Sequence, residues 1–306
     1  MNKKVKKDSA LKKRISEMKR NGLIVNLFGL IPLIWGILLT LLVLWAINVS
    51  FAEPNWYLDN SNTFLTKEFT AHNFVDAIQK FKMQVSDVQQ GIRIVNYLEM
   101  FLNSAWFSIG ATVMKMLSTV FFAYAIARFE FPGRKFLYAF VVLQMMLPVY
   151  GQTSANYNLL LNLNLVDTPL FLLAQGAGHG MYFLIAYSFF RNLPSGYAEA
   201  AKIDGAGPFT IFFKVMLPLA RSITVALATM QFIACWNDYQ TVIIYLKSYP
   251  TLSGALYTLK NQAFNLGLQT PQYFAGVFIS IIPVATLFII FNKQIMENVS
   301  IGGLKG

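Results

Sequence analysis

The sequence predicts an all-α integral membrane protein with six transmembrane helices and both termini in the cytoplasm. Its 306 residues are 56% hydrophobic and only 13% charged, a composition too apolar for an ordinary soluble domain. Six long apolar runs carry few charges, which is typical of helices that cross a membrane. Basic residues are concentrated in every second connection between these runs, as expected if those connections face the cytoplasm.

The N-terminal segment of residues 1–24 is a basic tail beside the first apolar run. It holds nine Lys and Arg residues against two acidic residues, so much of the formal net charge of +11 lies here. A basic tail before a membrane helix indicates a cytoplasmic N-terminus, and this distribution argues against nucleic-acid binding. The next run, residues 27–47, is longer than the core of a signal peptide, so we expect an uncleaved first helix. Residues 25–306 are expected to form the membrane domain.

Residues 48–100 form a polar segment that we expect on the outer face of the membrane. It contains six acidic and four basic side chains, without the basic excess of a cytoplasmic loop. Five apolar side chains recur at roughly helical spacing and predict an amphipathic helix: Phe74, Val75, Ile78, Phe81 and Met83. Such a helix either packs as a cap on the outer mouth or offers a surface to a partner.

Five further apolar runs follow, and the loops between them agree with the predicted topology. We assign these spans to residues 105–127, 136–154, 169–190, 218–245 and 273–291. Arg128, Arg134 and Lys135 mark the loop between the second and third spans as cytoplasmic. Asp167 lies in a loop without basic residues between the third and fourth spans, which indicates the outer side.

A charged stretch at residues 199–218 interrupts the apolar pattern between the fourth and fifth spans. A Pro-Ser pair at 194–195 precedes good helix formers, whereas Gly205 and Gly207-Pro208 are expected to break the helix. The sequence therefore predicts a helix-turn-helix elbow at the membrane surface, with a second short segment over residues 209–215. Its expected apolar side consists of Ala200, Ala201 and Ile203. A solvated loop between two spans is the alternative.

The sequence lacks the motifs of nucleotide, metal and hydrolase sites. It contains no glycine-rich phosphate loop ending in Lys-Ser or Lys-Thr, and no Gly-x-Ser-x-Gly motif. Two histidines, His72 and His179, and one cysteine, Cys235, give no metal-binding cluster with the required spacing. We therefore expect neither a cofactor nor a metal. An intramembrane enzyme or a signalling protein is the alternative class.

The elbow carries a twenty-residue pattern that resembles a known family signature. The pattern is Glu-Ala-Ala, three residues, Gly, nine residues and Val-Met-Leu-Pro, from Glu199 to Pro218. It is similar to the "EAA" loop of ATP-binding-cassette (ABC) importer permeases, in which Ile is usual where Val215 stands. Shorter stretches resemble the carbohydrate branch of that family, which includes the maltose permeases. They lie at residues 103–104, 123–129, 131–135, 165–168, 203–206, 236–239 and 302–306.

The resemblance implies a sugar importer permease with the type I fold, in a bacterial-type cell membrane. Its partners would be a second, distinct homologous permease, two ATPase subunits, an extracytoplasmic solute-binding protein and the lipid bilayer. A separate chain would hydrolyse ATP, so this chain would not be an enzyme, and no nucleic acid would be involved. The elbow would dock into a cleft on the ATPase through Glu199, Ala200, Ala201, Asp204, Gly205 and Pro218. An importer of another solute, such as an amino acid, phosphate or polyamine, is the alternative.

Polar residues near the middle of the predicted spans suggest a solute path. A helix rises about 1.5 Å per residue, so the middle of a span lies roughly ten residues from its ends. By this count four polar residues lie at similar depth: Lys115, Gln144, His179 and Gln231. A cation at this depth usually faces a wet or protein-lined interior, so Lys115 would hydrogen-bond sugar hydroxyls or pair with an acidic sugar. Hydrogen bonding between helices is the alternative. Asn237 and Asp238 lie nearer the outer end and would line the entrance.

Overall fold

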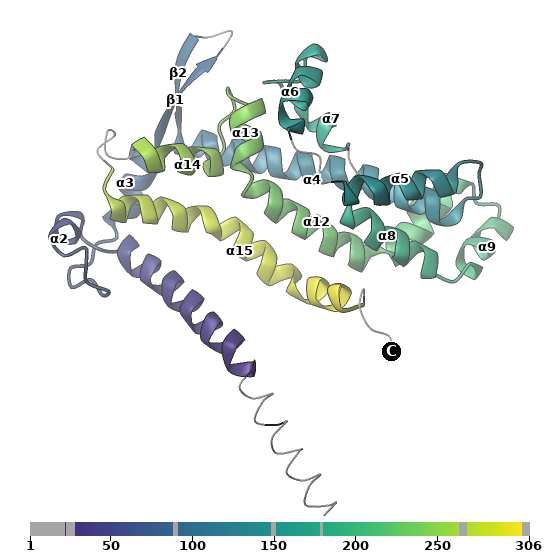
Figure 1. Cartoon of the computed structure of the whole chain (residues 1–306), viewed down its shortest axis with the longest axis horizontal. Helices are drawn as coiled ribbons and strands as arrows, with labels where there is room; N and C mark the ends of the chain where they lie inside the picture. The colour runs from purple at the N-terminus through teal and green to yellow at the C-terminus, as the bar shows by residue number, and fades with distance from the viewer. Residues whose placement is uncertain are drawn as a thin grey trace, which may run out of the picture. The chain divides into compact units, whose positions relative to one another are not determined.

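The computed structural model describes residues 22, 28–87, 91–147, 151–177, 180–262 and 268–301. Within these ranges, three helices are long and apolar enough to cross a membrane. They are Phe28–Ser50, α4 (Tyr97–Arg128) and the Thr270–Met296 part of α15, which runs over Thr270–Ile301 (Figure 1). These helices confirm the helical character of the first, second and sixth predicted spans. The basic tail and the C-terminal motif at residues 302–306 lie outside the described residues.

The chain divides into two compact units, and the smaller one comprises Met1–Asn73 and Gln269–Ala275. In this unit the Phe28–Ser50 helix is followed by α2 (Pro54–Asp59), whose start is capped by Glu53. The Asn73 side chain is buried and donates hydrogen bonds to the carbonyls of Ser50 and Ala52, at 3.0 and 2.7 Å. These bonds satisfy carbonyls beyond the end of the helix, so they fix the turn that follows it.

The larger unit, Phe74–Leu268 and Gly276–Gly306, is built around α4. This helix packs against α8 (Met181–Asn192) and α12 (Arg221–Trp236). Asn96 caps its start by accepting a hydrogen bond from the Glu99 amide at 2.9 Å. The packing produces a core of aromatic and aliphatic side chains: Val120, Ala123, Tyr124, Ile126, Phe183, Tyr187, Phe190 and Leu227.

The predicted third, fourth and fifth spans are interrupted in the structure, so six continuous transmembrane helices are not confirmed. The third divides into α5 (Arg134–Met146) and α6 (Gln152–Asn162), and the fourth into α7 (Phe171–Gln175) and α8. The fifth divides into α12 and α13 (Tyr239–Tyr245). At about 1.5 Å per residue, the 13 residues of α5 extend about 20 Å, short of a hydrocarbon core of about 30 Å.

Residues with helix-breaking or helix-capping character lie at these interruptions. Gly151 has a left-handed backbone, with φ of +77°, immediately before α6. Gly176 ends α7. Asp238 caps α13 by accepting a hydrogen bond from the Thr241 amide at 3.0 Å. Apolar composition predicts that a segment enters the membrane, but these local signals decide whether its helix is continuous.

A β-hairpin occupies part of the segment where we expected only an amphipathic helix. The helix exists as α3 (His72–Lys80), but it ends before Met83, which belongs to strand β1 (Lys82–Asp87). Strand β2 (Gly91–Asn96) pairs antiparallel with β1, from Lys82 opposite Asn96 to Asp87 opposite Gly91. Val85 and Val95 face inward, whereas Ile92 and Ile94 are exposed on the other face. Helix α14 (Leu252–Gln262) follows later in the chain (Figure 1).

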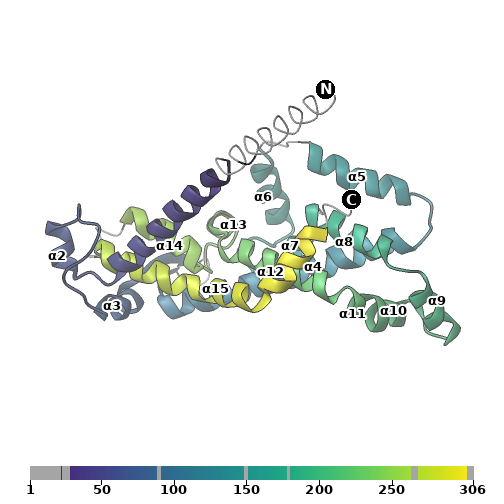
Figure 2. The same ribbon diagram turned by 90° about the horizontal axis from the view of Figure 1, so that it is seen from below.

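The elbow is a series of short helical segments at one end of the larger unit (Figure 2). It consists of α9 (Gly196–Ile203), α10 (Pro208–Ile211), a π-helical turn η1 (Phe212–Met216) and α11 (Leu217–Leu219). The chain then bends by 78° between Pro208–Leu219 and α12. A π-helical turn inserts an extra residue into a helix, and such turns are frequent at functional sites.

Candidate functional site

The elbow has the helix-turn-helix form that its sequence predicts. α9 ends where Gly205 adopts a left-handed backbone, with φ of +80°. The Gly205 amide donates to the carbonyl of Lys202 at 3.1 Å, and the Ala206 amide donates to that of Ala201 at 3.0 Å. Glycine is favoured at such a helix end because it has no Cβ to clash in the left-handed region. Pro208 then begins α10, where its missing amide hydrogen is not needed.

The three residues of the expected apolar side of the elbow differ in their packing within this chain. Ala201 packs against the core of the larger unit, together with Ala198 and Ala206. Ala200 is exposed, and Ile203 is 86% exposed, so these two side chains face away from that core. The reason is geometric, because the three alanines at 198, 201 and 206 already cover the core-facing side of this short helix and its turn.

The outward side of the elbow combines large apolar groups with charges. Four bulky side chains are exposed there: Tyr197, Ile203, Phe209 and Phe213. Three charged side chains lie exposed among them in the sequence: Glu199, Lys202 and Asp204. Exposed apolar groups mixed with charges are typical of a surface that binds another protein. We call these seven residues the elbow surface.

The base of the elbow is fixed to the core by aromatic packing. The Phe212 ring, which is 4% exposed, lies 4.8 Å from the Tyr124 ring and 5.4 Å from the Phe121 ring, centroid to centroid. Ile211 and Met216 are buried in the same cluster. Arg128, at the end of α4, donates to the carbonyl of Leu193 at 2.5 Å, just before the elbow. The elbow surface is therefore held on a rigid support formed with α4 and α8.

Lys115 binds the protein backbone at the interruption of the fourth predicted span. Its Nζ donates to the carbonyl of Ala177 at 2.9 Å, and Ser118 Oγ donates to the carbonyl of Gly176 at 2.7 Å. These carbonyls follow α7 and have no helical partner there, so two side chains of α4 satisfy them. In a membrane such backbone groups must be satisfied by protein. The contact gives Lys115 a structural role, and its role toward a solute stays a prediction.

The other predicted path residues are distributed over several elements. Gln231 donates to the thiol of Cys235 at 3.1 Å, one turn further along α12. Gln144 is exposed on α5, and no hydrogen bond joins it to the other path residues that the structure describes. His179 lies outside the described residues.

Asn237 and Asp238 occupy the interruption between α12 and α13. The Asn237 amide donates to the carbonyl of Ile233 at 2.8 Å, and Asp238 caps α13. Both side chains therefore stabilise the ends of the two helices. Their expected position at an entrance stays a prediction.

A polar network that sequence reasoning missed joins three distant segments of the larger unit. The carboxylate of Asp167 accepts hydrogen bonds from the Ser248 amide at 2.7 Å and the Ser248 hydroxyl at 2.6 Å. Arg93 of β2 forms an ion pair with Glu99 and donates to the carbonyl of Ser248 at 2.6 Å. Asp167 has φ of +57°, a conformation that Asp tolerates better than most residues, but no local sequence pattern pairs it with Ser248.

The described residues contain no group of three or more His, Cys, Asp and Glu side chains that could hold a metal ion. The candidate site has three parts. They are the elbow surface with its aromatic base, the end of α7 that Lys115 and Ser118 of α4 contact, and the Asp167–Ser248 network.

Comparison with known proteins gives consistent matches. The family model described as "Binding-protein-dependent transport system inner membrane component" matches residues 119–296, which include the elbow. The diacetylchitobiose uptake system permease protein NgcG of Streptomyces coelicolor is 29% identical over 277 residues, covering 88% of this chain and 85% of that protein. The arabinooligosaccharides transport system permease protein AraQ of Halalkalibacterium halodurans is 32% identical over 214 residues, covering 69% and 75%.

A similar fold is also found among solved structures. The crystal structure of a bacterial ABC transporter involved in the import of the acidic polysaccharide alginate contains a chain with a TM-score of 0.69. The match covers 88% of this chain and 96% of that chain, at 18% sequence identity.

Proposed function

The chain belongs to the family of binding-protein-dependent transport system inner membrane components, and on this premise we propose that it is a permease subunit of an ATP-driven oligosaccharide importer. One observation carries the proposal: the similarity to named oligosaccharide permeases extends over the elbow and the helices that support it. Members of this family are permeases and not enzymes, so ATP hydrolysis belongs to a partner chain.

The proposed assembly contains this chain, a second homologous permease, two ATPase subunits and an extracytoplasmic solute-binding protein. The family description supports a binding protein and an inner-membrane location. The basic tail and the basic loops support cytoplasmic termini under the positive-inside rule.

We count six membrane crossings, with α5–α6, α7–α8 and α12–α13 as interrupted crossings. Among the residues that the structure describes, three helices, or four spans if one bent pair is included, meet the length and composition expected of a span. Each helix of an interrupted pair is too short to cross the membrane alone. Non-helical backbone at membrane depth is tolerated where other parts of the protein satisfy its hydrogen-bonding groups. At the end of α7, Lys115 and Ser118 donate hydrogen bonds to the backbone carbonyls of Ala177 and Gly176. These bonds support an interrupted crossing at this place.

The elbow surface is the proposed contact with the ATPase. Its apolar groups offer contact area, and Glu199 is placed to meet a basic group on the partner. A Cβ added at Gly205 would meet no atom of this chain within 4 Å. A substitution there would therefore do harm in two other ways: it would strain the left-handed backbone, and it would block close approach of the partner. Lys115 and Gln231 are the proposed mid-membrane residues of the solute path, with Asn237 and Asp238 nearer the entrance.

The test is ATP-driven uptake by the reconstituted complex in proteoliposomes, with arabinotriose and diacetylchitobiose as solutes. Glu199→Lys and Gly205→Asp are expected to abolish uptake and to reduce co-purification of the ATPase, while the chain stays inserted. Glu130→Lys is the matched control, because Glu130 is an exposed glutamate in the other predicted cytoplasmic loop. Normal uptake by both elbow variants would contradict the coupling role. Absence of uptake of these two sugars and of an acidic oligosaccharide by the unaltered complex would contradict the substrate class.

A further inference from the structure

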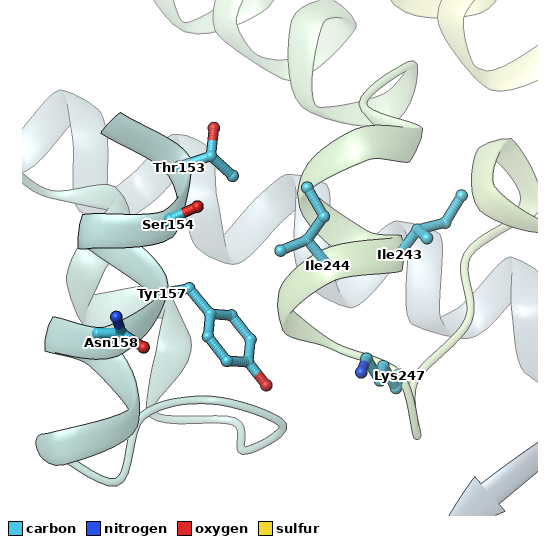
Figure 3. Close-up of a pocket in the computed structure, with 7 residues that line it drawn as sticks. All are labelled: Thr153, Ser154, Tyr157, Asn158, Ile243, Ile244 and Lys247. Atoms are coloured by element: carbon cyan, nitrogen blue, oxygen red, sulfur yellow. The ribbon is translucent and has the colours of Figure 1, made fainter. Parts of the chain in front are cut away.

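A polar hollow lies between α6 and α13 in the larger unit (Figure 3). Its volume is about 500 Å³, within the range of small-molecule sites. Thr153, Ser154, Tyr157 and Asn158 line it from α6, and Ile243 and Lys247 line it from α13 and the residues after it. Figure 3 shows the Tyr157 ring extending from α6 into the space between the two helices.

A second hollow of about 230 Å³ lies next to the β-hairpin. It shares two lining residues with the first hollow, Ile243 and Lys247. The second is lined by β1 through Met83 and Gln84, and by α14 through Thr258. We call the two hollows together the Lys247 groove.

The walls of the first hollow are held together by direct contacts. The Tyr157 ring packs 5.9 Å from the Tyr245 ring of α13, centroid to centroid. The Tyr245 hydroxyl donates to the backbone carbonyl of Thr153 at 3.3 Å. These contacts join α6 to α13 without using the polar side chains that face the hollow. The groove is therefore formed before any ligand arrives, which reduces the ordering cost of binding.

The lining of the groove carries one cation and no anion. The side chains of Thr153, Ser154, Asn158 and Lys247 make no hydrogen bond to any residue that the structure describes. No Asp or Glu lines either hollow. The hydroxyl and amide groups can both donate and accept hydrogen bonds, whereas the Lys247 ammonium only donates and carries the charge of the lining. An anionic group therefore complements the groove better than a neutral polyol does.

We propose that the Lys247 groove binds a sugar residue that carries a carboxylate or another anionic group, on the extracytoplasmic side of the permease. Lys247 pairs with the anion, the hydroxyl and amide groups of α6 bind the sugar hydroxyls, and the Tyr157 ring provides a flat apolar wall. The inference rests on the proposed function, because that function supplies the sugar class and the side of the membrane. It adds a preference for acidic over neutral oligosaccharides.

The experiment measures sugar binding separately from transport. The full permease complex is placed in nanodiscs without ATP or binding protein, and trigalacturonate or galactotriose is titrated while saturation-transfer NMR follows binding. We expect trigalacturonate to bind more tightly than galactotriose. Lys247→Gln is expected to weaken trigalacturonate binding roughly tenfold, because a charge-assisted hydrogen bond is lost, whereas Lys247→Arg retains binding. Tyr157→Ala is expected to weaken binding of both sugars.

Lys67→Gln is the matched control, since Lys67 is an exposed lysine on the same predicted side and lines neither hollow. The inference is overturned if trigalacturonate does not bind, if galactotriose binds equally well, or if the two Lys→Gln variants behave alike. ATP-driven uptake in proteoliposomes distinguishes the two proposals. If the complex takes up oligosaccharides but binding does not depend on Lys247, only the groove proposal is refuted. If the complex takes up no sugar at all, the proposed function is contradicted.

Discussion

Replacement of Asp167 should destabilise the larger unit more than its position in a loop suggests. Its carboxylate accepts two short hydrogen bonds from Ser248, which is 6% exposed. Hydrogen bonds to a charged group contribute about 1.5–3 kcal/mol each, and a buried amide left unsatisfied costs about 1–3 kcal/mol. Asp167→Ala also places alanine in the left-handed region, at a cost of about 1–2 kcal/mol. Because these contributions overlap, we expect a loss of about 3–5 kcal/mol in the free energy of unfolding.

A double-mutant cycle separates the carboxylate–hydroxyl bond from the other effects. Asp167→Asn keeps one acceptor oxygen and tolerance of the left-handed backbone, so we expect it to cost about 1–2 kcal/mol. Combined with Ser248→Ala, it should reveal a coupling energy of about 1 kcal/mol. Unfolding by SDS in mixed micelles is the measurement. Trp106 provides a local signal, because its ring lies 5.9 Å from that of Tyr249, next to Ser248.

Asp59→Asn is the control for the cycle, since Asp59 is exposed and should change the free energy of unfolding by no more than about 0.5 kcal/mol. Strictly additive effects of Asp167→Asn and Ser248→Ala would refute the reasoning, because they would mean that the carboxylate and the hydroxyl do not interact.

Three further predictions concern topology, the α7 interruption and the elbow base. Single cysteines introduced near Asp167, at exposed Asn162, in a cysteine-free background should react with an impermeant reagent from outside, whereas those at Lys202 should react only after permeabilisation; outside labelling at Lys202 overturns the topology. Lys115→Met should reduce uptake while the complex still co-purifies, and should affect an acidic sugar more than a neutral one; unchanged uptake of both would leave Lys115 with its structural contact alone. Phe212→Ala should cost about 3–5 kcal/mol in unfolding, because a buried aromatic side chain is lost, whereas exposed Phe213→Ala should cost far less; equal losses would contradict the packing.

The elbow was predictable because its signals are local. Gly205 and Pro208 determine where α9 ends and α10 begins, and both are visible in the sequence. The direction of the faces was not predictable, since it depends on which alanines meet α4 and α8. Ile203 shows this, because it lies on the expected apolar side with Ala201, yet Ala201 packs against the core and Ile203 is 86% exposed.

The hairpin and the interrupted spans escaped prediction for different physical reasons. In β2, Ile92 and Ile94 are exposed while Val95 is buried, so apolar residues lie on both faces and the period-two pattern is lost. The interrupted spans are apolar on average, so their mean hydropathy does not reveal the breaks at Gly151, Gly176 and Asp238. The contact of Lys115 with the Ala177 carbonyl joins residues far apart in the sequence, and no local pattern encodes it.

The 78° bend between Pro208–Leu219 and α12 restricts how a displacement of the elbow can travel through the molecule. Because the two axes are nearly perpendicular, only roughly a fifth of a push along the first segment projects onto α12. Nearly all of the push is directed across α12, and the Phe212 contacts with Tyr124 and Phe121 on α4 resist this sideways component. A push on the proposed ATPase contact would therefore tilt α4 sideways more than it would slide α12 along its own axis.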